Sequence, residues 1–212
     1  MLRRSLTTLL ALALTLILAA GAFSVLTMQK GSAQRAPVVT PTPGLTITSG
    51  YWYYAIHGRG AAALRAELNR LGPVDSSGKR FDAVTKWWVS WQYRSETKSG
   101  MCAIASVDVL VKLRFTYPSW KKPAWPTAAL VRKWNRYLKA LTIHEEGHAK
   151  NAVQAGNRIL RGIRAQAPRS SCAALSSAAS TLGRREVKRA NDADVAYDAR
   201  TRHGATQGAI FA

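Results

Sequence analysis

The feature that most constrains the fold is one helical pattern over residues 127–165 that contains the H-E-x-x-H motif of residues 144–148. Residues four apart lie on one face of a helix, so His144 and His148 can bind one zinc ion together. Glu145 then lies beside the metal-bound water, where it can act as general base. The spacing therefore predicts a zinc hydrolase helix with Zn²⁺ as cofactor.

The apolar residues of this pattern indicate which way the motif faces. They recur at helical spacings, at Leu130, Trp134, Leu138, Leu141, Ala152, Ile159 and Ile163. The motif lies on the same stripe, so we expect it to point into the protein, toward a sheet and the last helix. Two buried imidazoles and a carboxylate are costly without partners, and a metal ion satisfies all three. Gly147 costs a helix about 1 kcal/mol relative to Ala, so we expect another segment or a substrate to pass close to it.

A catalytic zinc ion needs a third protein ligand, and the sequence leaves its identity open. The short continuation with a third histidine is absent, because Gln154 takes that place. His203 ranks first, and Asp198 second, either as a ligand or as the group that orients a ligating histidine. Weaker candidates are Asp194, Glu186 and His57. Tyr197 is a candidate oxyanion donor beside the catalytic Glu145, although a packed tyrosine explains it equally well.

Around the motif helix, the sequence predicts an α+β fold. Three segments have the pattern of strands: 51–56, 83–93 and 103–115. The last two alternate apolar and polar residues, which indicates a hairpin with one wet face. Further helices are predicted at 61–71 and from after Cys172 to about Thr201, whereas the proline-rich residues 117–126 are predicted as a loop. We expect a small antiparallel sheet packed on the motif helix and a C-terminal helix.

The N-terminal part is a segment of its own. Residues 5–28 carry no charge and follow two arginines, so residues 1–33 form either a cleavable signal peptide or a single membrane anchor. Residues 34–48 are expected to form a linker, and residues 49–212 one domain. In either case the domain is exported, as a periplasmic, secreted or inner-membrane-anchored protein.

The two cysteines agree with export. Cys102 and Cys172 lie far apart and outside any zinc-binding spacing. In an oxidising compartment such a pair most often forms a structural disulfide, which is the bond we predict.

The net charge of +20 favours anionic partners. A field of this sign attracts anionic lipid surfaces and acidic envelope polymers. No recognised nucleic-acid motif accompanies the basic residues, so we expect no specific nucleic-acid site.

The motifs together resemble a bacterial family of predicted secreted zinc-dependent proteases, domain of unknown function 922. The resemblance rests on the N-terminal segment, the motif at 144–148 and the terminal pattern Tyr197-Asp198-x-x-Thr201-x-His203-Gly204-x-x-Gln207-Gly208. It covers about residues 50–210, including both cysteines. It implies a zincin-like peptidase domain with His144 and His148 as ligands and Glu145 catalytic, and it leaves the third ligand open.

The sequence therefore predicts an exported zinc-dependent metallopeptidase that acts on peptides or proteins. The alternative is a non-catalytic basic protein that binds the envelope and holds structural zinc or none. A zinc amidase acting on wall peptides shares every residue of the argument. Glu145 favours an enzyme, because a structural zinc site has no use for a general base.

Overall fold

The computed structural model describes residues 29–30, 42–75 and 78–212. The uncharged run 5–28, and with it the predicted signal or anchor, lies outside the described residues. Within the part described, no helix combines the length and the apolar character needed to cross a membrane.

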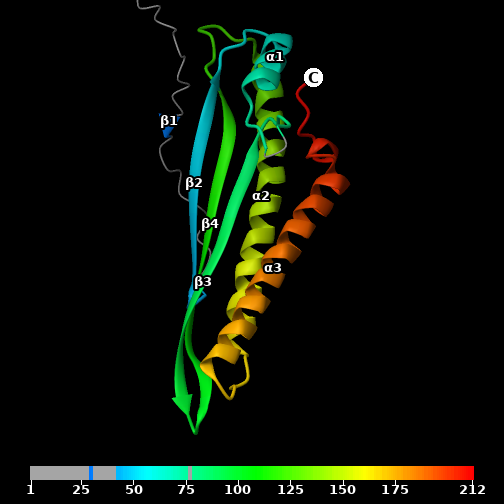
Figure 1. Ribbon diagram of the computed structural model, residues 1–212. Coiled ribbons are helices and arrows are strands. Elements are labelled where there is room, and N and C mark those ends of the chain that lie inside the picture. The colour runs from blue at the N-terminus through cyan, green and yellow to red at the C-terminus, as the bar shows by residue number, and fades with distance from the viewer. Residues whose placement is uncertain (1–28, 31–41, 76–77) are drawn as a thin grey trace, which may run out of the picture.

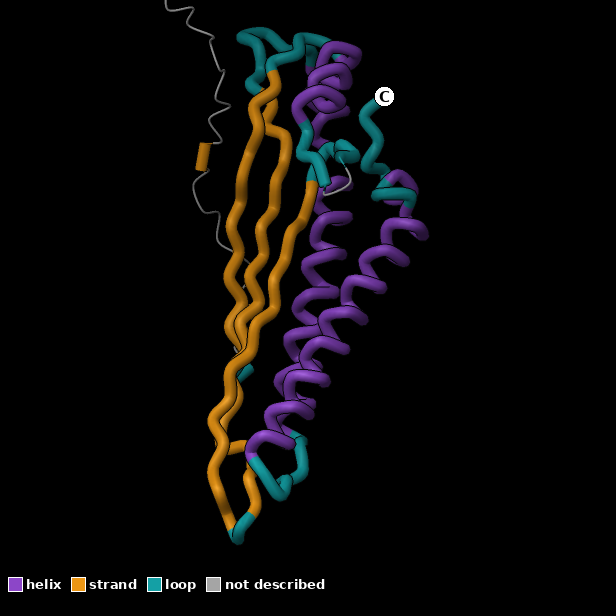
Figure 2. The backbone as a smooth tube through the Cα atoms, in the orientation of Figure 1, coloured by secondary structure: helices purple, strands orange, loops and turns teal. Residues whose placement is uncertain are grey.

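The described chain forms a sheet with two long helices on one face (Figure 1). Figure 2 shows the same layers, with the short helix at one end and the hairpin turn at the other. The elements in chain order are β1 (Gln29–Lys30), β2 (Leu45–Ile56), α1 (Ala61–Leu71), β3 (Val84–Lys98), β4 (Met101–Trp120), α2 (Ala128–Arg164), α3 (Cys172–Thr201) and the 3₁₀ helix η1 (Ala205–Gln207). The predicted α+β class is confirmed.

The sheet has the strand order β1-β2-β4-β3. β3 and β4 form the predicted antiparallel hairpin, and its turn residues Ser99 and Gly100 have φ of 51° and 76°, as a two-residue hairpin turn requires. The expectation of a purely antiparallel sheet is wrong, because β2 pairs parallel to β4. The chain reverses twice between these strands, once through α1 and once in the hairpin turn, so both run in the same direction.

All three predicted strands extend beyond their predicted ends, and β3 continues to Lys98. β2 begins at Leu45, so residues 45–48 of the predicted linker belong to the sheet. β4 continues to Trp120, so residues 117–120 are strand and not loop. The pairing of β3 with β4 ends at Thr116, which leaves one edge of β4 unpaired at Pro118. A proline, which lacks an N–H, is tolerated at such an edge.

The predicted alternation of buried and exposed residues along β4 holds only on the C-terminal side of a bulge. Arg94 pairs with Ser106, but Ser95 pairs with Ile104, so Ala105 is an extra residue on β4. An extra residue shifts the faces of the strand beyond it. Ala105, expected in the core, is therefore exposed, while Cys102 is buried.

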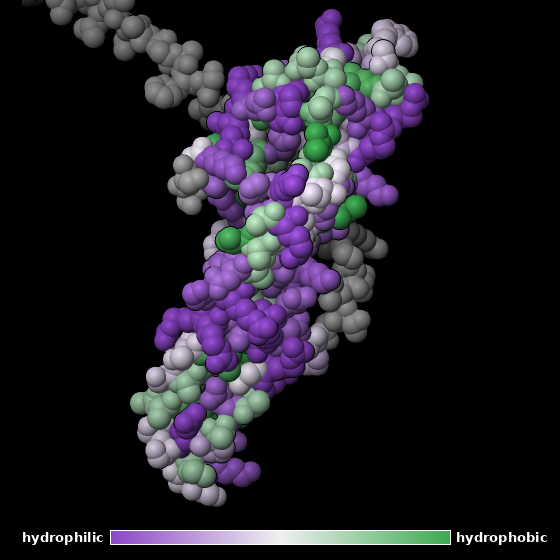
Figure 3. Space-filling view, turned by 90° about the vertical axis from the view of Figure 1, so that its right-hand side faces the viewer, coloured by the Kyte–Doolittle hydropathy of each residue, from purple (hydrophilic) through white to green (hydrophobic). Residues whose placement is uncertain are grey.

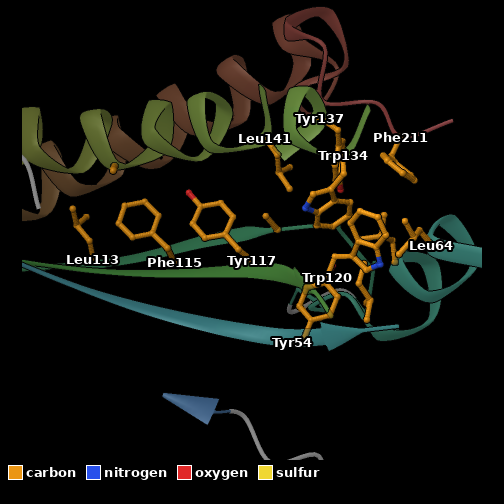
Figure 4. Packing of buried hydrophobic residues seen from close by; sticks show 14 of the residues in the cluster. Tyr54, Leu64, Leu113, Phe115, Tyr117, Trp120, Trp134, Tyr137, Leu141 and Phe211 are labelled. Atoms are coloured by element: carbon orange, nitrogen blue, oxygen red, sulfur yellow. The ribbon is translucent and has the colours of Figure 1, made fainter. Parts of the chain in front are cut away.

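The predicted motif helix is confirmed as α2. Thr127 caps its first turn, since the hydroxyl accepts a hydrogen bond from the Leu130 N–H at 3.3 Å. Its apolar stripe is buried against the sheet, with Leu138 partly exposed. In Figure 4, Phe115 and Tyr117 point from β4 toward α2. This packing fixes the face on which the motif lies.

α3 packs along α2 and also contacts β3 near Gly183. At Gly183 a Cβ atom would lie 2.1 Å from the Trp91 ring, so the glycine permits the close approach. The predicted disulfide joins Cys102 of β4 to Cys172 at the start of α3. Figure 3 shows that the outer face of the helices is mainly hydrophilic, as a solvent-facing layer requires.

Candidate metal centre

The motif side chains lie where α2, the last turns of α3 and the start of β3 meet. His144 and Glu145 are buried, each 4% exposed, and the side chain of His148 is 12% exposed. α3 supplies Asp194 and Asp198, one turn apart on the same face. The inward orientation expected from the apolar stripe of α2 is therefore confirmed.

Each imidazole is held through its Nδ1 atom. His144 Nδ1 lies 3.0 Å from the amide oxygen of Gln207, and His148 Nδ1 lies 3.0 Å from Asp194 Oδ1. Both partners are acceptors, so each Nδ1 carries a proton. In the neutral ring each Nε2 is then left with a lone pair, the form in which histidine binds a metal.

The two Nε2 atoms converge on one carboxylate oxygen. Asp198 Oδ1 lies 3.2 Å from His144 Nε2 and 3.2 Å from His148 Nε2. It is buried and has no hydrogen-bond partner within the described chain. The three residues form a group whose ligand atoms lie within 4.8 Å of one another. Ligands about 2.0 Å from a tetrahedral ion are separated by ~3.3 Å, which both measured Nε2–Oδ1 separations match.

The charges of the centre also favour a cation. Burial raises the pKa of Asp198, but the neighbouring His144 and His148 rings outweigh burial and lower it. Burial lowers the pKa of His148, but Asp194 and Asp198 outweigh burial and raise it to about 10. The raised pKa of His148 and the lowered pKa of Asp198 both mean that the cluster favours positive charge. A divalent ion can supply that charge in place of a proton on His148.

The remaining candidates for the third ligand are not part of the trio. His203, ranked first, is outside the trio, with Nδ1 3.5 Å from Asp198 Oδ1 and a side chain 45% exposed. Asp194 holds His148 from behind through Nδ1. Glu186 accepts a hydrogen bond from Arg158 Nε at 2.8 Å, and His57 is exposed near Glu67. The geometry favours Asp198 over all of them.

The Glu145 carboxylate is held by a residue that the sequence did not suggest. The Thr85 hydroxyl donates a hydrogen bond to Glu145 Oε2 at 2.7 Å. Burial raises the pKa of Glu145, and Thr85 with the two histidines offsets part of that rise. A buried carboxylate with a raised pKa, held in one orientation beside the trio, is a candidate proton-transfer group.

Tyr197 lies against the two imidazoles as a packed ring. It stacks on His144 at 5.1 Å between ring centroids, with 12° between the planes, and meets His148 edge-on. Its hydroxyl accepts a hydrogen bond from Gln207 Nε2 at 3.0 Å, and it does not line the cavity described below. This placement fits a positioning role better than oxyanion donation.

Gly147 is explained by this ring. A Cβ atom there would lie 2.3 Å from Tyr197, so α3 passes close to α2, as the helix-interior glycine predicted. The tyrosine ring fills the space between the helices and fixes the distance between them.

A cavity of about 570 Å³ opens in front of the trio. Its walls include Phe81, which precedes β3, Thr85, which belongs to β3, and His203, which follows α3. His203 has φ of 51° and follows Arg202 at 50°, a left-handed pair that costs about 1–3 kcal/mol per residue. Lys79 Nζ lies 3.2 Å from His203 Nε2. The cavity is thus lined by the three candidate ligands, the Glu145 carboxylate and the Lys79 ammonium.

Of the four residues that support the site, only Gln207 could have been suspected from the sequence, and only in part. Gln207 belongs to the terminal pattern, but nothing in that pattern says that it holds His144. Thr85 looks like any strand threonine. Trp87 and Asn151 each donate a 2.7 Å hydrogen bond to Asp194, and neither has a spacing that relates it to the motif. The packing of β3 on α2 brings Thr85 and Trp87 to the site, and the turn after α3 brings Gln207.

Comparison with known proteins gives one result. Searches of the curated proteins and of the solved structures found no match. Residues 51–204 match the family described as "Bacterial protein of unknown function (DUF922)", a span that includes α2, α3 and the whole trio. The chain belongs to the DUF922 family of bacterial proteins.

Proposed function

We propose that the chain is an exported zinc-dependent metallopeptidase. The observation that carries the proposal is the convergence of His144 Nε2 and His148 Nε2 on Asp198 Oδ1, each at 3.2 Å. The buried Glu145 lies next to this trio in the same cavity. A two-histidine, one-carboxylate set with an adjacent carboxylic acid is one of the arrangements that zinc hydrolases use.

A catalytic site fits the observations better than a structural one. Structural zinc sites are closed by four protein ligands, whereas catalytic sites keep a position open. Among the described residues the trio supplies three ligand atoms, and the cavity in front of it gives access to a substrate. The second histidine ligand of the trio is further braced by Asp194, as is common for metal-binding imidazoles.

The roles of the protein residues follow from their positions. Zinc supplies Lewis acidity, which makes water a nucleophile at neutral pH. Glu145 accepts the proton of the attacking water and later gives it to the leaving amine. Thr85 keeps that carboxylate in one orientation through its 2.7 Å hydrogen bond. Lys79 and His203 are on the cavity wall, and the Lys79 ammonium is the group placed to donate a hydrogen bond to the developing oxyanion.

The test compares two neighbouring glutamates in the full chain. Glu145→Gln removes the buried base, and Glu146→Gln removes an exposed carboxylate one residue away. We expect about one zinc per chain in both variants, and casein or peptide-library hydrolysis reduced about 10²- to 10⁴-fold only in Glu145→Gln. Zinc without hydrolysis in the unmodified chain contradicts the enzyme and supports the alternative of a structural site. A folded chain that binds no zinc contradicts the whole proposal.

A further inference from the structure

One end of the molecule carries an exposed aromatic residue among lysines. The loop of residues 121–127 joins β4 to α2 at the top of Figure 1. Trp125 in this loop is 94% exposed, far more than Trp88, which at 52% is the only other tryptophan among the exposed large hydrophobic residues described. Burying a tryptophan normally stabilises a protein, so a ring held in solvent calls for an explanation.

The loop holds Trp125 outward. Lys121 at its start donates a backbone hydrogen bond to the Ile56 carbonyl at 2.8 Å, and the Thr127 cap fixes its end. Pro123 and Pro126 lie on either side of the tryptophan. The residue before a proline is restricted to extended conformations, which keeps Trp125 from joining the helix. The exposed ring is therefore a feature of an anchored loop.

The chain segment that contains Trp125 carries only positive charges. Residues 121–144 contain six lysines and arginines and no acidic residue. Lys121 and Lys122 are exposed. The N-terminus of α2 lies at the same place with no acidic residue in its first turn, so its partial positive charge adds to theirs.

We propose that the loop of residues 121–127 docks on an anionic lipid membrane, with Trp125 at the boundary of headgroups and acyl chains. Tryptophan prefers this boundary because its ring is apolar and its N–H is polar. The lysines beside it match the phosphates, each contributing about 1 kcal/mol at an anionic surface. A protein partner or a soluble acidic polymer would need the lysines but offers no such layered environment to the indole.

Docking at this end has a consequence for the proposed cavity. His144 lies 16 residues beyond the start of α2 at Ala128, a rise of about 24 Å along the helix. The cavity would face material near the membrane surface and not the membrane itself. The inference does not depend on the proposed hydrolysis, because none of the loop residues lines the cavity.

The first experiment tests insertion of the ring. The full chain is mixed with phosphatidylglycerol-containing vesicles whose acyl chains carry bromine, and tryptophan fluorescence is recorded. We expect quenching in the unmodified chain that is reduced in Trp125→Phe, since that variant lacks the emitting ring. The N-terminal segment is present in both proteins and cancels in the comparison. Equal quenching in the two proteins overturns the proposal.

The second experiment tests the charges by cosedimentation with the same lipids without bromine. Lys121→Ala/Lys122→Ala is expected to weaken binding about thirtyfold. Arg184→Ala/Arg189→Ala removes the same charge from exposed positions on α3 and is expected to have a much smaller effect. Trp125→Ala is compared with Trp88→Ala in the same way, and only the first is expected to weaken binding.

Two further outcomes overturn membrane docking. Equal losses in the two double variants would mean that the overall positive field alone attracts the vesicles. Binding to a soluble acidic polysaccharide that depends on Trp125, without Trp125-dependent vesicle binding, would assign the loop to a polymer partner.

Discussion

At the scale of single residues, the candidate centre depends on atoms that hold the reacting groups in place. Each proposed histidine ligand has its Nδ1 fixed by an acceptor, and Glu145 has its carboxylate fixed by Thr85. Such partners decide the tautomer and direction of a side chain, so losing one changes activity without removing the reactive group.

Replacing Thr85 tests this dependence. Thr85→Val keeps the shape of the side chain and removes the hydroxyl, and a hydrogen bond to a charged group is worth about 1.5–3 kcal/mol. We expect kcat/KM for peptide hydrolysis to fall at least about tenfold, with zinc content unchanged. Thr85→Ser, which keeps the hydroxyl, should retain most activity. Loss of zinc in Thr85→Val would instead mean that the threonine supports the whole centre.

At the scale of elements, the centre connects two helices. His144 and His148 come from α2 and Asp198 comes from α3. The same helices are kept at a fixed distance by Tyr197 over Gly147. Metal binding and helix packing should therefore stabilise each other.

Removing the metal tests the connection between the helices. A ligand present at 100 times its Kd stabilises the folded state by about 2.7 kcal/mol, so a chelator should lower Tm by roughly 5–10 °C in a domain of this size. Asp198→Asn should lose most of this response. The matched control is Asp192→Asn, an exposed residue of α3 paired with Lys188, which should keep it. A response unchanged by Asp198→Asn would exclude Asp198 as a ligand.

Adding a methyl group at Gly147 tests the packing. Alanine is the better helix former by about 1 kcal/mol, but its Cβ would lie 2.3 Å from a rigid ring, and overpacking costs about 1–3 kcal/mol. We expect Gly147→Ala to lower the free energy of unfolding and the zinc affinity. Gly162→Ala meets only the mobile end of Leu182 at 2.7 Å and should be nearly neutral. Denaturant unfolding of both variants measures the difference.

At the scale of the whole molecule, the sequence predicted elements better than their arrangement. Helical periodicity located α2 and α3 closely, because each buries one continuous stripe or is capped at a clear residue. The parallel pairing of β2 with β4 was missed. The direction of pairing depends on the path of the chain between the two strands, and no local sequence pattern records that path. The shift of faces at Ala105 was missed for a similar reason, since a bulge is defined by the partner strand.

The site was predictable to the same extent. The i, i+4 histidines and the adjacent glutamate follow from one helix, so a local pattern is enough to find them. The choice of Asp198 over His203 depends on the angle at which α3 crosses α2 and on the left-handed turn at Arg202 and His203. The contact of Thr85 with Glu145 depends on how β3 is positioned along α2. Both are tertiary contacts, and the spacing of residues along the sequence does not predict them.

The elongated shape separates the disulfide from the site, which leads to a last prediction. Cys172 lies 26 residues before Asp198 on α3, about 39 Å along the helix. The bond closes a loop across a sequence separation of 70, so Cys102→Ala/Cys172→Ala should cost roughly 4 kcal/mol of unfolding free energy on the chain-entropy account. Under native conditions the zinc content and the hydrolysis of the folded variant should stay near those of the unmodified chain, because the distant end of α3 is still packed on α2. Denaturant unfolding measures the first effect, and metal analysis of the folded fraction measures the second. Zinc loss in a variant that still folds would show that the order of α3 is transmitted over its full length, and that the disulfide end and the metal end behave as one cooperative unit.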